Sequence, residues 1–411
     1  MRRQQKRISR REFLGHSLFG LGCFGLARTK GSPFGDRHGV IQRETPEREP
    51  IRRSLGKTGL RLPIVSLGVM NADNPDLVRR AVDLGVRHFD TAHGYQRGRN
   101  EAMVGSVIQE LGVREKTVIA TKAMTPSERQ GKTPQQAKQN FIKAVEESLR
   151  RLRTDYIDIL YVHDIKDAGE INNPGITEAL ALLKDQKKTR FVGFSTHANM
   201  AACIEEACRG KFYDVVLTTF NYALADDTEL LSSFQKARDA GIGLIAMKTQ
   251  CSQYWYRDSL PPSQQRYYEG QILHSALLKW ALRHDVITTA VPGCTTLYQL
   301  ETDWQAAFDL AYTQEEERFF QNRKIKTELA YCVQCSRCVS TCPQAVDIPS
   351  LMRTHMYLTC YSNPSLASQT LEGVSRSNGL QACSSCDSCR ANCSRGVPVV
   401  RRIGELKLAL A

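Results

Sequence analysis

Eight cysteines near the end of the chain have the type and spacing of metal ligands. They form two runs of the pattern Cys-x2-Cys-x2-Cys-x3-Cys. Thiolates are soft ligands that suit iron–sulfur clusters and zinc. Zinc sites usually use two separated Cys-x-x-Cys pairs rather than triplets, so the spacing favours iron–sulfur clusters and leaves zinc as the alternative. The candidate ligands are Cys332, Cys335, Cys338, Cys342, Cys383, Cys386, Cys389 and Cys393.

The two runs resemble those of bacterial ferredoxins with two [4Fe–4S] clusters. In that pattern, three closely spaced cysteines bind one cluster and the fourth binds the other. The segment between the runs, residues 348–361, is expected to be helical, so the module is similar to the α-helical type of ferredoxin. Pro343 follows the first run, whereas no proline directly follows the second. The resemblance implies one cluster on Cys332, Cys335, Cys338 and Cys393, and one on Cys383, Cys386, Cys389 and Cys342.

A second set of reactive side chains follows predicted strands in the first two thirds of the chain. Asp90, Lys122 and His163 end three successive strands, and Tyr95 follows Asp90 by five residues. A phenol can protonate the alkoxide that hydride transfer to a carbonyl leaves, but an ordinary tyrosine pKa is about 10. A nearby ammonium group lowers that pKa. We therefore expect Lys122 to activate Tyr95, Asp90 to hold Lys122, and His163 to orient the carbonyl oxygen.

Strand-like and helix-like segments alternate eight times between residues 64 and 311. This order predicts a closed (β/α)8 barrel, whose reactive groups lie at the carboxyl ends of the strands. No Gly-x-Gly-x-x-Gly follows the first strand, which disfavours a Rossmann fold. The predicted strands are 64–69, 87–92, 118–123, 156–163, 191–196, 215–220, 244–248 and 288–292. The predicted helices are 76–84, 100–111, 133–152, 175–187, 198–209, 229–240, 271–283 and 297–311.

The residues around the reactive set resemble the aldo-keto reductases over roughly residues 51–311. Phe89-Asp90-Thr91-Ala92-His93-Gly94-Tyr95 is similar to that family's signature loop. Ala120-Thr121-Lys122 and Leu160-Tyr161-Val162-His163 are similar to its lysine and histidine segments. The resemblance implies hydride transfer between a nicotinamide nucleotide and a small carbonyl or alcohol substrate. It assigns catalysis to Tyr95, Lys122, Asp90 and His163.

The expected nucleotide contacts match the family only in part. Thr196 stands beside Ser195 where the family has asparagine, and 292–296 lacks the Lys and Arg that clamp a 2′-phosphate in members that prefer NADPH. A phosphate without such a partner loses charge-assisted hydrogen bonds, so NADP held by a different clamp from the inserted loop, NAD, and weak nucleotide binding all stay open. The loop 250–268, rich in Tyr and Trp, is a candidate cover for the site. The expected contacts are Ser195, Thr196, Asn221, Lys248, Gly293 and Thr295.

The first 30 residues have the features of an export signal. They contain eight Lys or Arg and one acid, so they hold +7 of the chain's net charge of +13. Ser9-Arg10-Arg11-Glu12-Phe13-Leu14 followed by a short apolar stretch resembles a twin-arginine signal peptide. This predicts export by the twin-arginine machinery to the periplasm or cell envelope. The remaining charge is spread over the chain without an aromatic and basic cluster, which argues against nucleic-acid binding.

The sequence thus predicts a (β/α)8 TIM barrel with a smaller, mainly α-helical, iron–sulfur domain. The expected order is a signal peptide (1–30), a linker (31–50), the barrel (51–311), a connecting helix (312–328) and a ferredoxin-like domain (329–411). Clusters relay single electrons, so we expect carbonyl or alcohol chemistry coupled to a redox partner protein. The alternative is an iron–sulfur electron carrier whose barrel only docks or binds a partner.

Overall fold

Eight parallel strands form one sheet whose spatial order follows the chain. In the computed structural model the described residues are 48–124, 133–250, 273–322, 331–361, 363–386 and 388–410. Parallel bridges from Val65 to Ala290 and from Gly68 to Gly293 join the first strand to the last and close the sheet into a barrel. The strands are β3 (Leu67–Gly68), β4 (His88–Asp90), β5 (Val118–Met124), β6 (Ile157–Ile165), β7 (Thr189–Thr196), β8 (Val215–Thr219), β9 (Gly243–Met247) and β10 (Thr289–Ala290).

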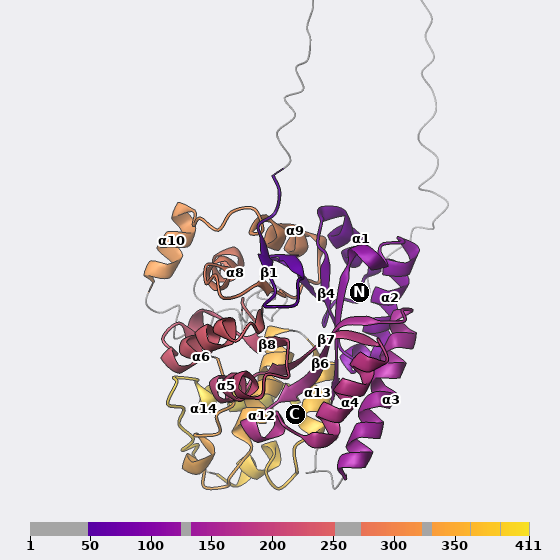
Figure 1. The fold of residues 1–411 in the computed structure, drawn as a ribbon. Coiled ribbons are helices and arrows are strands. Elements are labelled where there is room, and N and C mark those ends of the chain that lie inside the picture. The colour runs from indigo at the N-terminus through magenta and orange to yellow at the C-terminus, as the bar shows by residue number, and fades with distance from the viewer. Residues whose placement is uncertain are drawn as a thin grey trace, which may run out of the picture. The chain divides into compact units, whose positions relative to one another are not determined.

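Helices follow the strands and surround the barrel, which confirms the predicted (β/α)8 fold (Figure 1). Several begin with a side-chain cap, as Asn74 shows by accepting a hydrogen bond from the amide of Asp76. Such caps satisfy amides that a first helical turn leaves unpaired. The helices are α1 (Pro75–Leu84), α2 (Arg99–Glu110), α3 (Pro134–Leu152), α4 (Pro174–Asp185), α5 (Met200–Gly210), α6 (Thr228–Asp239), α8 (His274–Leu282) and α9 (Leu297–Gln305).

A hairpin that the sequence did not lead us to expect precedes the barrel. Its strands β1 (Arg52–Ser54) and β2 (Arg61–Pro63) are antiparallel. Leu55 and Leu62 are buried and pack with residues inside the barrel. The amide of Lys57 donates to the carbonyl of Gly241, which lies just before β9. The hairpin therefore covers the amino ends of the strands, and the carboxyl ends remain for the site.

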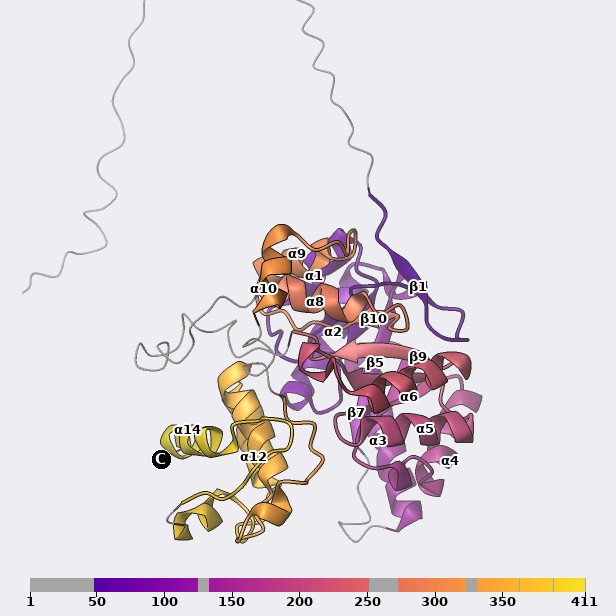
Figure 2. The same cartoon turned by 90° about the vertical axis from the view of Figure 1, so that its left-hand side faces the viewer.

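The C-terminal segment (residues 331–410) is mainly helical and has its own apolar core. Helix α12 (Ile348–His355) continues into a π-helical turn (Met356–Cys360), which agrees with the helix predicted over 348–361. It packs against α13 (Pro364–Glu372) and α14 (Val399–Leu410), as Figure 2 shows for α14. Helix α10 (Gln314–Gln321) lies within the segment 312–328 that we expected to connect the two domains, and residues 323–330 lie outside the described residues.

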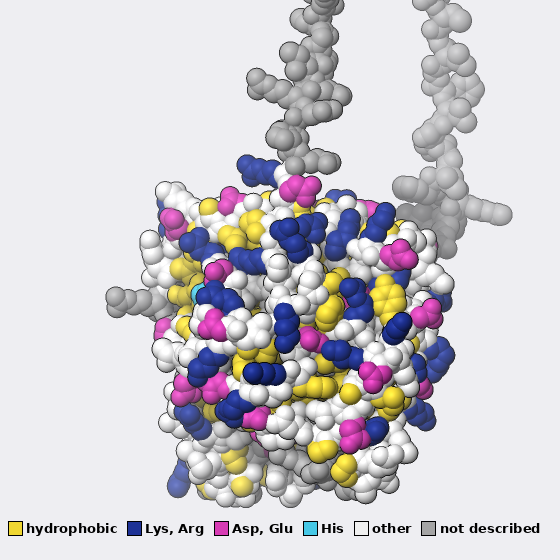
Figure 3. Space-filling view, viewed as in Figure 1, with side chains coloured by type: hydrophobic (Ala, Val, Ile, Leu, Met, Phe, Trp, Pro, Cys, Tyr) yellow, Lys and Arg dark blue, Asp and Glu magenta, His cyan; other side chains and the backbone are white. Residues whose placement is uncertain are grey.

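The signal peptide and most of the linker lie outside the described residues. On the face drawn in Figure 3, Lys and Arg side chains alternate with Asp and Glu rather than forming one basic patch. None of the helices in the described part of the chain combines the length and apolar character needed to cross a membrane.

Candidate active site

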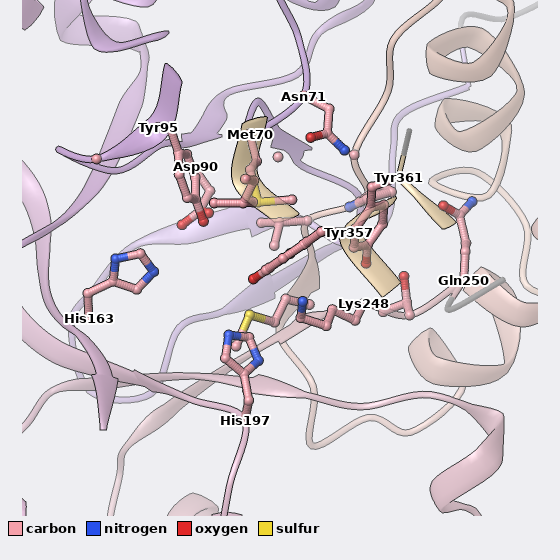
Figure 4. Close-up of a pocket in the computed structure, with 18 of the residues that line it drawn as sticks. Met70, Asn71, Asp90, Tyr95, His163, His197, Lys248, Gln250, Tyr357 and Tyr361 are labelled. Atoms are coloured by element: carbon pink, nitrogen blue, oxygen red, sulfur yellow. The ribbon is translucent and has the colours of Figure 1, made fainter. Parts of the chain in front are cut away.

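The four predicted catalytic residues lie together at the carboxyl ends of three neighbouring strands. Lys122 of β5 donates to Asp90 Oδ1 of β4 at 2.5 Å and to the carbonyl oxygen of Thr91 at 2.7 Å. The Lys122 ammonium nitrogen lies 5.0 Å from the centroid of the Tyr95 ring. The Tyr95 and His163 rings meet edge to face with centroids 5.9 Å apart (Figure 4). Chain order around the barrel thus brings the four side chains to one place.

The electrostatics of Tyr95 differ from the expectation. Burial raises the pKa of the Tyr95 phenol, and the carboxylates of Asp90 and Asp164 raise it further. Burial therefore outweighs the lowering of this pKa that we expected from the nearby Lys122 ammonium group. Tyr95 is therefore a protonated phenol, a state that can donate a proton to a bound alkoxide but resists ionisation on its own.

His163 is neutral in this site. Burial lowers the pKa of its imidazole to about 3, and the positive charge of Lys122 lowers it too. A neutral imidazole can donate one hydrogen bond without competing with Tyr95 as an acid. The arrangement therefore offers a carbonyl oxygen one hydrogen-bond donor from His163 and one acidic proton from Tyr95.

Three of the four residues, Asp90, Tyr95 and His163, border a cavity of about 340 Å³ with polar and apolar walls. The C-terminal segment contributes Tyr357, Tyr361, Leu366, Gln369 and Thr370 to the lining. The Tyr357 hydroxyl points into the space between His163 and His197 (Figure 4). Sequence reasoning missed this wall, because nothing local marks residues so far along the chain as neighbours of the barrel.

Lys248 lies where the C-terminal segment meets the cavity. Its backbone is left-handed, with φ of 57°, and its ammonium nitrogen is 5.4 Å from the centroid of the Tyr361 ring. The Met356 sulfur accepts from the same nitrogen at 3.9 Å. His197, also in the wall, bonds through Nδ1 to the Thr219 hydroxyl, and burial lowers the pKa of its imidazole.

The other predicted nucleotide contacts lie at varying depth. Ser195 Oγ accepts from the amide of Asp164 at 3.0 Å, the Thr196 hydroxyl donates to the carbonyl of Ala198, and Asn221 Nδ2 donates to the carbonyl of Lys248. These three side chains are buried behind the cavity wall. Lys248 and Gly293 line the cavity, and Thr295 lines an adjoining one of about 900 Å³ that also contacts Tyr95.

The cavity wall contains buried polar atoms that suit a polar ligand. Among the described residues, Asp90 Oδ2 and Thr249 Oγ1 have no hydrogen-bond partner. Both residues line the cavity, and Gly293 has open space at the position of a Cβ, with only Gly68 O at 3.9 Å. Because buried polar groups are normally paired, these atoms fit the polar edge of a bound nicotinamide or substrate.

The turn after β10 is organised around its own side chains. Gln299 Oε1 accepts from the amides of Thr295 and Thr296, so it occupies the two backbone donors that directly precede α9. Deeper in, Gln250 Nε2 donates to Asp303 at 2.5 Å and the Cys294 thiol donates to the same carboxyl. These two amides are therefore not available to a 2′-phosphate, and residues 292–296 contain no Lys or Arg.

The eight clustered cysteines are free thiols in the C-terminal segment. The pKa of the Cys332 thiol is raised to about 12, mainly by burial and in smaller part by the neighbouring Cys338 and Cys393. Burial also raises the pKa of the Cys383 thiol, as do Cys342, Cys386 and Cys389. These neighbours are the sets that the ferredoxin resemblance implies, although Cys338 also interacts with Cys342.

The spacing and chemistry of these thiols fit iron–sulfur clusters, but their arrangement is not that of a closed metal site. Across the described ranges, no three His, Cys, Asp or Glu side chains are grouped closely enough to hold one metal ion. The assignment of these cysteines as cluster ligands therefore depends on their spacing in the sequence and on which thiols lie near one another.

Comparison with known proteins agrees with the barrel fold. Residues 62–254 match the model of the Aldo/keto reductase family. L-galactose dehydrogenase of Arabidopsis thaliana is 27% identical over 289 residues, which are 63% of this chain and 88% of that protein. L-glyceraldehyde 3-phosphate reductase of Escherichia coli K12 is 26% identical over 318 residues, 64% of this chain and 89% of that protein.

A solved aldo-keto reductase from Bacillus halodurans has the same fold. It superposes with a TM-score of 0.53 at 23% identity and covers 66% of this chain and 96% of its own. These matches each leave about a third of the present chain unmatched. The family match, the oxidoreductase relatives and the strand-end residues of the barrel lead to one conclusion: the chain contains an aldo-keto-reductase-like oxidoreductase domain.

Proposed function

We propose that the protein interconverts a carbonyl and an alcohol on a small molecule by hydride transfer with a bound nicotinamide nucleotide. The observation that carries this proposal is the buried Lys122–Asp90 pair beneath Tyr95, with His163 edge-on to the same phenol. The names of the relatives, a galactose dehydrogenase and a glyceraldehyde phosphate reductase, favour a sugar-like substrate.

The roles of the residues follow from their protonation states. The nucleotide, when bound, supplies or accepts the hydride. Tyr95 donates its phenolic proton to the carbonyl oxygen in reduction and takes a proton back in oxidation. His163 donates a hydrogen bond to the same oxygen, and Lys122 stabilises the negative charge that Tyr95 acquires. Asp90 keeps Lys122 in place through the bond of 2.5 Å.

Exchange of Tyr95 for phenylalanine tests the enzyme against the electron-carrier alternative. Loss of nucleotide-dependent turnover, with the ultraviolet circular dichroism and iron content unchanged, supports hydride chemistry. Unchanged turnover in Tyr95→Phe would contradict the proposal and favour the alternative in which the barrel is a docking module.

We propose that NADH and NADPH bind with similar affinity. The support is the turn after β10, where Gln299 occupies the amides of Thr295 and Thr296 and the buried Asp303 lies behind them. A 2′-phosphate gains little without charge-assisted partners. Calorimetric titration of nucleotide-stripped protein with each nucleotide decides this: dissociation constants within about tenfold support it, and a preference of ~100-fold for NADPH contradicts it.

We also propose that the eight cysteines hold two [4Fe–4S] clusters that pass electrons between the barrel and a redox partner protein. The cysteine spacing and the two sets of neighbouring thiols support this. Anaerobically reconstituted protein should contain about eight iron atoms per chain. Cys386→Ser should lower that content by about half, whereas Cys208→Ser, outside both runs, should not. Stoichiometric zinc without iron would contradict the proposal.

The leader supports export through the twin-arginine machinery to the periplasm or cell envelope, a route for proteins that fold before transport. Residues 1–30 lie outside the described part, so the proposal depends on Ser9-Arg10-Arg11-Glu12-Phe13-Leu14. Replacing Arg10 and Arg11 together by lysine should retain the protein in the cytoplasmic fraction. Export that continues in this variant would contradict the proposal.

A further inference from the structure

Arg353 of the C-terminal segment binds both carboxylate oxygens of a barrel residue beside the active site. Its Nη1 lies 2.7 Å from Asp164 Oδ2 and its Nη2 lies 3.1 Å from Asp164 Oδ1. Their side chains are only 13% and 10% exposed. Burial alone would raise the pKa of Asp164, but the guanidinium group brings it well below its usual range. The contact is therefore a buried, bidentate pair of charges.

Asp164 directly follows the catalytic His163 in an irregular part of β6. The pairing of β6 with β7 shifts register between Val162 and Ile165, and the Asp164 backbone is left-handed, with φ of 61°. Residues other than glycine rarely adopt this backbone conformation, so contacts around Asp164 must stabilise it. One support is Ser195, whose hydroxyl accepts from the Asp164 amide at 3.0 Å. Arg353 provides the other.

The same guanidinium group reaches the first cysteine run. Arg353 Nη2 donates to Gln334 Oε1 at 2.6 Å, and Gln334 stands between Cys332 and Cys335. The Gln334 backbone is also left-handed, with φ of 54°. Arg353 therefore connects two irregular turns, one that carries cysteine ligands of the proposed cluster and one that carries the catalytic histidine.

We propose that Arg353 is a positioning residue for the hydride-transfer site. By fixing the Asp164 turn it sets the direction of the His163 imidazole, and it makes the site complete only when the C-terminal segment is docked. This inference rests on the proposed function for the turnover part of its test. A small displacement of a group that orients the reacting carbonyl can cost about 100-fold in rate, so the effect should fall on kcat.

The structure supplies a matched control. Arg395 of the C-terminal segment forms an ion pair of 2.8 Å with Asp227, which caps α6 of the barrel. This pair also joins the two parts of the chain, but Asp227 is not adjacent to a catalytic residue. Arg395→Gln therefore removes another ion pair between the two parts, a single and more exposed one, without disturbing the His163 turn.

The test compares Arg353→Gln, Arg353→Lys and Arg395→Gln in the full chain with clusters reconstituted. We expect kcat to fall by about 10- to 100-fold in Arg353→Gln, with the dissociation constant of the nucleotide nearly unchanged. Lysine keeps the charge but loses the bidentate geometry, so Arg353→Lys should recover only part of the rate. Arg395→Gln should stay within about twofold of wild type. Equal kcat values in Arg353→Gln and Arg395→Gln would overturn the inference.

Hydrogen exchange gives a second reading that does not require turnover. Arg353→Gln should speed exchange in a peptide covering 163–166, and Arg395→Gln should not. If wild type shows no turnover, the proposed function fails, and this exchange difference still decides whether Arg353 holds the turn. If Arg353→Gln does not fold, Asp164→Asn probes the same pair by the same two measurements. Unchanged exchange in 163–166 would overturn the inference.

Discussion

The ammonium nitrogen of Lys248 lies 5.3 Å from the centroid of the Tyr357 ring, although the two residues belong to different parts of the chain. Lys248 follows β9 of the barrel, and Tyr357 follows α12 of the C-terminal segment. A cation over an aromatic ring in a partly buried setting contributes about 0.5–2 kcal/mol. The contact ties the wall of the cavity to the barrel, so the C-terminal segment shapes the space in which a substrate binds.

Replacing Tyr357 by alanine should widen the cavity and change substrate choice. The Tyr357 side chain extends into the cavity (Figure 4), so its removal makes room for larger groups. We expect the ratio of kcat/KM for bulky over small carbonyls to rise by about tenfold, in the range that pocket volume controls. Steady-state kinetics over a size series of aldehydes measures it. Tyr298→Ala, at a residue 74% exposed, is the control and should leave the ratio unchanged.

Replacing Lys122 should lower both stability and turnover, and a second substitution at Asp90 should restore only the stability. Lys122→Met leaves the buried Asp90 carboxylate without its partner, which costs about 3–5 kcal/mol of the free energy of unfolding. Asp90→Asn in the same chain removes the stranded charge, so the double variant should recover much of that stability but no turnover. Urea unfolding and nucleotide-dependent assays measure the two effects. Recovery of turnover in the double variant would show that Lys122 has no catalytic role.

The sequence predicted those parts of the site that depend on the order of strands. Asp90, Lys122 and His163 end successive strands, and parallel strands that follow one another along the chain lie side by side in a barrel. Local sequence patterns are therefore enough to predict that these three side chains lie close together at one end of the barrel. The alternation of strands and helices predicted the closed barrel for the same reason.

Contacts across long separations could not be predicted in this way. Arg353 and Asp164 are 189 positions apart, and neither belongs to a recognisable pattern. The only local feature that could have indicated this contact was an acidic residue directly after His163. The pKa of Tyr95 also escaped prediction, because burial outweighs the nearby ammonium group and the sequence does not report burial.

The raised pKa of Tyr95 predicts a specific dependence of rate on pH. Since Tyr95 stays protonated and the pKa of His163 is about 3, neither group ionises near neutrality. We expect kcat/KM for carbonyl reduction to be flat between about pH 6 and pH 9. Alcohol oxidation needs the phenolate and should rise across the same range. An alkaline fall in the rate of reduction below about pH 9 would mean that Lys122 does lower the pKa of Tyr95.

The buried Asp303 predicts a stability that falls as pH rises. Burial raises its pKa to about 7, although hydrogen bonds from Gln250 and Cys294 oppose this effect. In the unfolded chain the carboxyl ionises near pH 4, so between about pH 4 and pH 7 the folded state holds a proton that the unfolded state has released. A tenfold difference in proton affinity between the two states corresponds to about 1.4 kcal/mol, which sets an upper limit of ~4 kcal/mol lost by pH 8.

The asparagine in Asp303→Asn cannot ionise, so the stability of this variant should increase relative to wild type as pH rises. We expect the difference in Tm between Asp303→Asn and wild type to move in favour of the variant from about pH 5 to pH 8, by several degrees for a stability change of a few kcal/mol. Asp83→Asn, at an exposed position in α1, is the control and should show no such trend. A difference that stays constant with pH would mean that Asp303 is ionised in the folded protein, and that Gln250 and Cys294 stabilise its charge more strongly than burial opposes it.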